Sequence, residues 1–261
     1  MPRLPGRLGQ KSRQVGQYGR LPAHRPVGLY ELPRYVAGSL PRPPEKVEVP
    51  NVRGVLGAPW GILGNNKFGD CGVAGAAHLF MADAAVTGEH ESFPTAEEVV
   101  QYYLAYTGGR DSGVVLADFL GHVRASGFFG HEVAAYAPVA KRDVTTLRQV
   151  VHLYDGCYAG IVVTQAMEMA FARSEPWTTA TATGQVIGGH CVIPVGYDEH
   201  YVYVVTWGEI QRVTWLGWLA IVEEAWAVIT GELVARHGNG RGVDLKALVA
   251  DLDTLGEIRI A

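Results

Sequence analysis

Residues Asn65–Leu79, with the sequence NNKFGDCGVAGAAHL, place a cysteine at the point where a loop is expected to become a helix. Gly69 and Gly72 flank an Asp-Cys pair, and the residues after Cys71 are small or apolar, which is typical of a buried helix. The partial positive charge at a helix N-terminus favours a thiolate over a thiol. Cys71 is therefore a candidate nucleophile, and the alternative is that it fills the core as a small apolar side chain.

A candidate base for this nucleophile lies in a second segment, Gly188–Asp198 (GGHCVIPVGYD). His190 enters a run of β-type residues there, and Tyr201–Gly208 (YVYVVTWG) is predicted to form a hairpin with that run. A catalytic cysteine and histidine need to be neighbours only in the folded chain. The two segments therefore predict a Cys71–His190 pair.

Both segments resemble those of the papain-like cysteine peptidase superfamily. Asn65 lies six residues before Cys71, where these enzymes carry an amide that helps to bind the oxyanion. The Asp-Cys-Gly-x-Ala motif at Asp70–Ala74 is nearest to that of the bacteriocin-processing (double-glycine) peptidases, and Gly189–Gly208 resembles the papain histidine segment. The resemblance covers roughly residues 60 to 230. The chain is also similar to uncharacterised papain-like proteins of actinobacteria and their phages.

This resemblance implies an α+β fold of two lobes, a helical lobe with Cys71 and an antiparallel β lobe with His190. It implies that Cys71 is the nucleophile, that His190 is the base, and that Asn65 helps to bind the oxyanion. Two positions depart from the family pattern: Asn65 is one methylene shorter than the usual Gln, and Thr206 stands where an Asn or Asp orients the histidine. Thr206 matches that residue in position, whereas Asp198 in the turn matches it in chemistry.

The composition is that of a folded protein, with 261 residues of which 48% are hydrophobic and 18% charged. Residues 1–16 lack the apolar segment of a signal peptide, and the longest apolar stretch, Trp215–Ile229, contains two glutamates. We therefore expect a protein that has no membrane span and is located in the cytoplasm or within a phage particle. Three cysteines argue against a disulfide framework, and the scattered histidines show no metal-ligand spacing, so no metal or cofactor is expected.

The first 55 residues are predicted to form an extended arm in front of a papain-like domain at 56–261. Residues 1–60 hold ten Lys or Arg against three Glu, and ten of the fourteen prolines, so this segment buries too little apolar surface to fold alone. The rest of the chain is acidic. Other protein subunits and nucleic acid are both partners that suit a basic arm, and a solvated leader is the simpler alternative. We expect the arm to pack against other subunits as an assembly device.

Local signals predict the order of the elements. Thr95–Glu98 is a capping box for one helix, and Asp143 caps another. The run Thr178–Thr183 is predicted to be an exposed loop. The last helix is predicted to stop at Gly256, before an edge strand over residues 257–260. Helices that come first and strands that follow agree with the two-lobe plan.

Two functions from different classes fit these features. The first is a papain-like cysteine hydrolase that cleaves an amide (peptide-type) bond of a peptide-like substrate through a thioester on Cys71. The second is a structural component of a phage particle, built on a papain-like scaffold with a vestigial site and anchored by its N-terminal arm. The nucleophile and base favour the enzyme, whereas Thr206 and the arm favour the scaffold.

Overall fold

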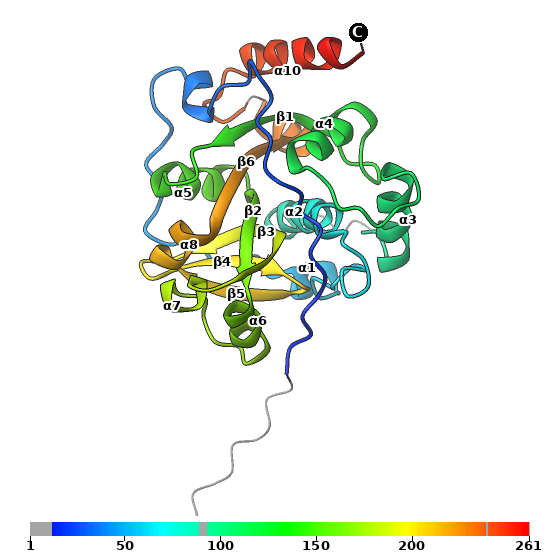
Figure 1. The fold of residues 1–261 in the computed structure, drawn as a ribbon. Coiled ribbons are helices and arrows are strands. Elements are labelled where there is room, and N and C mark those ends of the chain that lie inside the picture. The colour runs from blue at the N-terminus through cyan, green and yellow to red at the C-terminus, as the bar shows by residue number, and fades with distance from the viewer. Residues whose placement is uncertain (1–11, 89–92, 239, 261) are drawn as a thin grey trace, which may run out of the picture.

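A six-stranded antiparallel sheet forms the centre of the protein, in a computed structural model that describes residues 12–88, 93–238 and 240–260 (Figure 1). The strand order is β1-β6-β2-β3-β4-β5. The strands are β1 (Val133–Val139), β2 (Tyr158–Thr164), β3 (Val186–Tyr197), β4 (Tyr201–Thr206), β5 (Glu209–Thr214) and β6 (Val222–Thr230). The long strand β3 pairs with β2 over its first half and with β4 over its second half, so it links the two parts of the sheet.

Helix α2 (Cys71–Thr87) packs against β3 and is buried over nearly its whole length. It begins at Cys71, after Asp70, and it ends before Gly88, whose left-handed φ of 75° needs no Cβ. The other α-helices surround the sheet and α2. They are α1 (Val52–Leu56), α3 (Ala96–Tyr106), α4 (Leu116–Ser126), α5 (Val144–Leu153), α6 (Gln165–Ala172), α7 (Thr179–Ala182), α8 (Trp215–Ile221), α9 (Gly231–His237) and α10 (Leu245–Ile260).

The predicted caps are present because they depend only on residues three apart. Thr95 and Glu98 form the reciprocal capping box of α3, and the Asp143 side chain accepts a hydrogen bond from the Thr146 N–H at the start of α5. The helical lobe and the antiparallel sheet together give the predicted α+β architecture.

The described part of the N-terminal arm, residues 12–50, lies against the body of its own chain. In Figure 1 its first part runs as a dark blue segment up the front of the molecule toward α10, and its later part descends in a lighter blue along the left side. It includes a 3-10 helix, η1 (Leu32–Tyr35), which packs against α10 and β1, and its Val47 pairs with Tyr197 of β3. The apolar core therefore includes arm residues such as Leu29 and Leu32. Contact of the arm with other subunits stays a prediction.

Two predicted segments are wrong. The run at Thr178–Thr183 contains the short helix α7, because the Thr178 hydroxyl accepts a hydrogen bond from the Thr181 N–H and caps it. Helix α10 continues through Gly256 to Ile260, so there is no edge strand at 257–260. Glycine stops a helix only where the backbone turns left-handed, and packing of α10 on β1 outweighs its low helix propensity. Within the described ranges, no helix is long and apolar enough to cross a membrane.

Candidate active site

The Cys71 thiol lies at the first turn of α2 and is 2% exposed. Its Sγ accepts a hydrogen bond of 3.4 Å from the backbone N–H of Cys191, the residue after His190 on β3. Small residues make this approach of α2 to β3 close: a Cβ on Gly75 would lie 2.8 Å from Cys191 Sγ. The helix and the strand therefore bring the nucleophile segment and the histidine segment together.

His190 lies on β3, is 1% exposed, and is held by one hydrogen bond. Its Nε2 lies 2.8 Å from Oγ1 of Thr206, the last residue of β4. Its Nδ1 has no hydrogen-bond partner among the residues that the structure describes. When Nε2–H donates to Thr206, Nδ1 is left as a proton acceptor. The indole of Trp207 covers the ring, with 4.7 Å between ring centroids.

Four of the predicted site residues, Cys71, His190, Thr206 and Asn65, line one small cavity. Its volume is about 10 Å³, which is near the lower limit for a single water molecule. The Asn65 Nδ2 donates to the backbone carbonyls of Phe68, at 2.9 Å, and of Gln17 in the arm, at 3.2 Å. The amide of Asn65 is therefore long enough to reach a carbonyl oxygen lying in this cleft.

Asp198, the fifth predicted site residue, is not part of the site. Its carboxylate accepts hydrogen bonds from the backbone N–H groups of His200 and Tyr201 and from the Tyr203 hydroxyl, so it stabilises the β3–β4 turn. It follows His190 by eight residues of extended chain, which corresponds to about 25 Å. Thr206 takes the orienting position because β4 runs back beside β3 and returns its last residue to the histidine.

The N-terminal arm crosses the site, and sequence reasoning missed this. The Gln17 N–H donates to the Asn65 carbonyl at 2.6 Å, and the Arg20 N–H donates to the Gly189 carbonyl at 3.1 Å. Between them, the Gly19 N–H lies near enough to the Cys71 thiol to lower its pKa. The Tyr18 ring meets the His190 ring edge-on, with 6.2 Å between ring centroids.

Close contacts around Gly19 fix the course of the arm. A Cβ on Gly19 would overlap the backbone carbonyl of Gly69, so only glycine fits there. The Gly19 carbonyl accepts a hydrogen bond from the Val114 N–H, and the Leu21 N–H donates to the Val114 carbonyl. These two bonds form a parallel bridge between the arm and Val114. Glycines in a Pro-rich arm are common whatever the arm does, so the sequence holds no separate signal for this contact.

Burial makes the Cys71–His190 pair neutral while the arm is in place. Loss of water raises the pKa of the Cys71 thiol to about 11, although the N–H groups of Cys191 and Gly19 lower it in part. Burial lowers the pKa of His190 to about 3, and the charge of Arg20 contributes in the same direction. A thiolate–imidazolium pair therefore does not form at neutral pH in this closed arrangement.

Two other titratable groups lie beside the pair. His78 also lines the cavity, but its Nε2 donates to the backbone carbonyls of Trp60 and Gly61, and burial lowers its pKa to about 4. This histidine anchors the loop before α2. Burial raises the pKa of Asp70, just before Cys71, to about 7. In the parts of the chain that the structure describes, no cluster of His, Cys, Asp or Glu is suited to hold a metal ion.

Comparison with known proteins identifies the fold. No protein-family model and no curated protein sequence matches the chain. Among solved structures, it is similar to xylellain, a cysteine protease from Xylella fastidiosa, with a TM-score of 0.60 and 14% sequence identity over 85% of this chain and 98% of that chain. It also matches the cysteine protease CMS1MS2 of Carica candamarcensis, with a TM-score of 0.41 and 16% identity over 71% of this chain and 98% of that one. The chain therefore has the fold of the papain-like cysteine peptidases.

Proposed function

We propose that the chain is a cysteine hydrolase that cleaves an amide bond in peptide-like substrates. The observation that supports this most directly is the shared cavity, where Cys71 at a helix N-terminus meets His190, which is oriented by Thr206. Asn65 adds an amide donor to the same cavity. A nucleophile, an oriented base and an oxyanion donor are the three parts that acyl transfer requires.

The proposed reaction passes through a thioester. Nδ1 of His190 takes the proton of Cys71, and the thiolate attacks the carbonyl carbon, while the Cys71 N–H and the Asn65 amide stabilise the oxyanion. The C–N bond breaks, and the imidazolium gives its proton to the leaving amine. His190 then takes a proton from water, and the resulting hydroxide attacks the thioester carbon. The C–S bond breaks, the imidazolium returns its proton to the Cys71 sulfur, and the carboxylic acid leaves.

The proposal requires the arm to leave the cleft before substrate enters. The arm crosses the site between Asn65 and Gly189, and the Gly19 N–H lies near enough to the Cys71 thiol to lower its pKa. The arm therefore blocks the entry of substrate. The closed chain is then a latent form of the enzyme.

Alkylation by iodoacetamide tests both the site and its latency. Gly19→Ala adds a Cβ that overlaps the Gly69 carbonyl, so it should lift the arm from Cys71. Because the thiolate is the reactive species, we expect Cys71 in this variant to react at least tenfold faster at pH 7.5 than in the unmodified chain. Adducts at Cys71, Cys157 and Cys191 are separated by peptide mass spectrometry. The control is Val27→Ala, whose arm side chain is 89% exposed.

A second substitution asks whether His190 activates the thiol. Gly19→Ala combined with His190→Ala should return Cys71 to the rate of an ordinary thiol with a pKa of about 8.5. The Gly19→Ala chain should also hydrolyse a fluorogenic peptide mixture, and adding Cys71→Ala to it should abolish this hydrolysis. The proposal fails if Cys71 in the opened chain reacts no faster than Cys157 or Cys191.

The second candidate function is a structural component of a phage particle that keeps a papain-like scaffold with a vestigial site. The neutral, buried state of Cys71 and His190 is what a vestigial site would show, and the place of the chain in a phage particle stays a prediction. In that case the basic arm would act by binding other subunits or nucleic acid. An inert Cys71 in the opened chain, together with self-association that depends on residues 12–50, is the result expected from this alternative.

A further inference from the structure

The arm places one arginine in a slot between strands β2, β3 and β6. The Arg20 side chain is only 4% exposed. Its Nη2 lies 2.8 Å from the Glu223 carboxylate, and its Nη1 lies 3.3 Å from the Glu224 carboxylate. Two guanidinium nitrogens thus engage two neighbouring carboxylates, which suits a planar arginine better than the single ammonium of lysine.

Two glycines form the floor of this slot. A Cβ on Gly160 of β2 would lie 2.5 Å from the Arg20 Cδ and 2.8 Å from the Glu224 side chain. A Cβ on Gly189 of β3 would lie 3.0 Å from Nε and 3.1 Å from Nη2 of Arg20. Any other residue at either position would fill the space that the guanidinium occupies. The sheet is therefore shaped to accept a long, flat side chain here.

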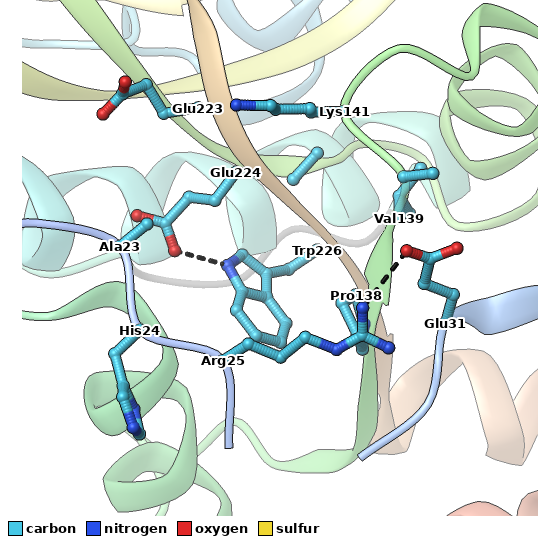
Figure 2. Close-up of a pocket in the computed structure, with 12 residues that line it drawn as sticks. Ala23, His24, Arg25, Glu31, Pro138, Val139, Lys141, Glu223, Glu224 and Trp226 are labelled. Atoms are coloured by element: carbon cyan, nitrogen blue, oxygen red, sulfur yellow. Dashed lines mark hydrogen bonds and ion pairs between the residues drawn. The ribbon is translucent and has the colours of Figure 1, made fainter. Parts of the chain in front are cut away.

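Glu224 is held in place independently of the arm. It is 7% exposed, and its second carboxylate oxygen accepts a hydrogen bond of 2.9 Å from the Trp226 indole (Figure 2). Burial raises its pKa, while Trp226 and Arg20 oppose that rise. A buried carboxylate with one fixed partner and one cationic partner needs a replacement cation when the arm leaves. Glu223, at the mouth of the slot, is more exposed.

The slot also lies next to the reacting atoms. Gly189, which forms part of its floor, directly precedes His190, and its carbonyl accepts a hydrogen bond of 3.1 Å from the Arg20 N–H. A cavity of about 230 Å³ continues from Glu224 and Trp226 between the arm and strands β1 and β6 (Figure 2). A peptide in the cleft could therefore place a side chain in the slot while a neighbouring residue lies at Cys71.

We propose that this slot recognises an arginine side chain of the substrate, and that Glu224 is its specificity-determining residue. In the closed chain, Arg20 occupies the position that the substrate arginine takes after the arm leaves. The inference rests on the proposed hydrolase function, and it adds the substrate class: peptides with arginine close to the cleaved bond.

Binding of a small arginine probe tests the slot without any catalysis. The chain for this experiment is full length and carries Arg20→Ala, which empties the slot, and Cys71→Ala, which removes the nucleophile. By calorimetry, we expect Nα-acetyl-arginine N-methylamide to bind at least tenfold more tightly than the citrulline analogue, which has nearly the same shape and no charge. The chain with Arg20 in place should bind neither. Equal binding of the two probes, or no binding of the arginine probe, overturns the inference.

Two substitutions in the same background assign the binding to the slot. Glu224→Gln keeps an oxygen for the Trp226 hydrogen bond and removes the charge, so it should weaken arginine binding at least tenfold. Gly160→Ala places a methyl group in the guanidinium space and should abolish binding with the charges intact. Thermal unfolding of each variant establishes that it is folded. Arginine binding that survives Gly160→Ala in the folded protein contradicts the assigned position.

Hydrolysis separates this inference from the proposed function. With Cys71 restored, the chain that carries both Gly19→Ala, to open the cleft, and Arg20→Ala, to empty the slot, should cleave a fluorogenic peptide containing arginine with a kcat/KM at least tenfold above that of the citrulline peptide. Glu224→Gln should remove this difference in kcat/KM. Cleavage of both peptides at equal rates overturns the arginine specificity and leaves the hydrolase. Arginine binding to a chain whose opened Cys71 is inert overturns the hydrolase instead.

Discussion

At the position that orients His190, the chain uses the Thr206 hydroxyl, 2.8 Å from Nε2, in place of an amide or a carboxylate. A neutral hydroxyl fixes the ring and its tautomer, but it stabilises the imidazolium less than a carboxylate does. Trp207 lies over the ring and limits the access of water to this hydrogen bond. Thr206 therefore positions the base, and the charge balance of the site depends on how much water reaches it.

Removing the Thr206 hydroxyl should slow the site without unfolding the protein. Thr206→Val has nearly the same shape and leaves Nε2 of His190 without its partner, which costs about 1 kcal/mol. In the Gly19→Ala background, we expect alkylation of Cys71 at pH 7.5 to fall about fivefold, and peptide hydrolysis to fall at least as much. The rate of Cys71 alkylation is measured by quenching the reaction at set times and quantifying the adduct by mass spectrometry.

Thr206→Asn is the matched control, because it returns the amide that the resemblance predicts at this position. It should restore the rate to that of Gly19→Ala or above. A Thr206→Val variant that reacts as fast as its parent would show that the hydroxyl has no positioning role.

Offsets within short segments predicted four of the eleven residues that line the cavity. Asn65 lies six residues before Cys71 and Thr206 sixteen after His190, and both line the cavity. The choice of Asp198 by chemistry was wrong, because its carboxylate is taken up by the turn. Glu224 could not be identified, because its role depends on Arg20, 204 positions away in the chain.

At the scale of elements, the site depends on how closely α2 approaches β3. Gly75 permits that approach, with Cys191 Sγ 2.8 Å and Ile193 Cδ1 3.3 Å from where a Cβ would lie. The sequence predicted the start of α2 at Cys71 and the caps of α3 and α5, because these depend on neighbouring residues. The packing distance between α2 and β3 depends on side chains far apart in the sequence, so a short sequence pattern cannot predict it.

Gly75→Ala should destabilise the protein even though alanine favours helix by about 1 kcal/mol. The added methyl group presses on Cys191, and overpacking of a core costs about 1–3 kcal/mol. We therefore expect a lower midpoint of urea denaturation and a slower reaction of Cys71. Combining Gly75→Ala with Cys191→Ala removes the opposing sulfur. The double variant should lose less unfolding free energy than the two single variants lose in total. If the losses are strictly additive, the contact between residue 75 and Cys191 is not the cause.

At the scale of the whole molecule, the same arm covers the candidate site and contributes to the core of the fold. Its residues close the cleft at Gly19, fill the acidic slot with Arg20, and then join the core through Leu29 and Leu32 before reaching α10. The composition predicts an arm that cannot fold alone, and the described part of that arm lies against the body of the chain. It did not identify the surface that the arm covers, since a basic, Pro-rich segment has the same composition whether it covers its own cleft or another subunit.

The closed state should be most stable between about pH 6.5 and 9, because of the two groups that it buries. The pKa of His190 falls from 6.5 to about 3, so its neutral form favours docking above pH 6.5, and this contribution is lost as the pH falls toward 3. The pKa of Cys71 rises from 9 to about 11, so its contribution is present below pH 9 and is lost as the pH rises through 11. Burial also raises the pKa of Asp70 to about 7, but the side chains that contribute to this shift, Asn65 and Asp111, belong to the body of the protein, so it affects the stability of the body and not the docking of the arm.

Mild acid should therefore loosen the arm and open the cleft. Between pH 7 and pH 5 the His190 contribution decreases by roughly 1–2 kcal/mol, since one pKa unit corresponds to about 1.4 kcal/mol. Hydrogen exchange of peptides spanning residues 12–25, corrected for the intrinsic effect of pH, should become about tenfold faster at pH 5. His78 keeps its two carbonyl partners in the body of the protein and should not contribute to this change. His190→Gln cannot titrate, so the acid dependence should disappear in that variant; if it persists there, another group controls the arm.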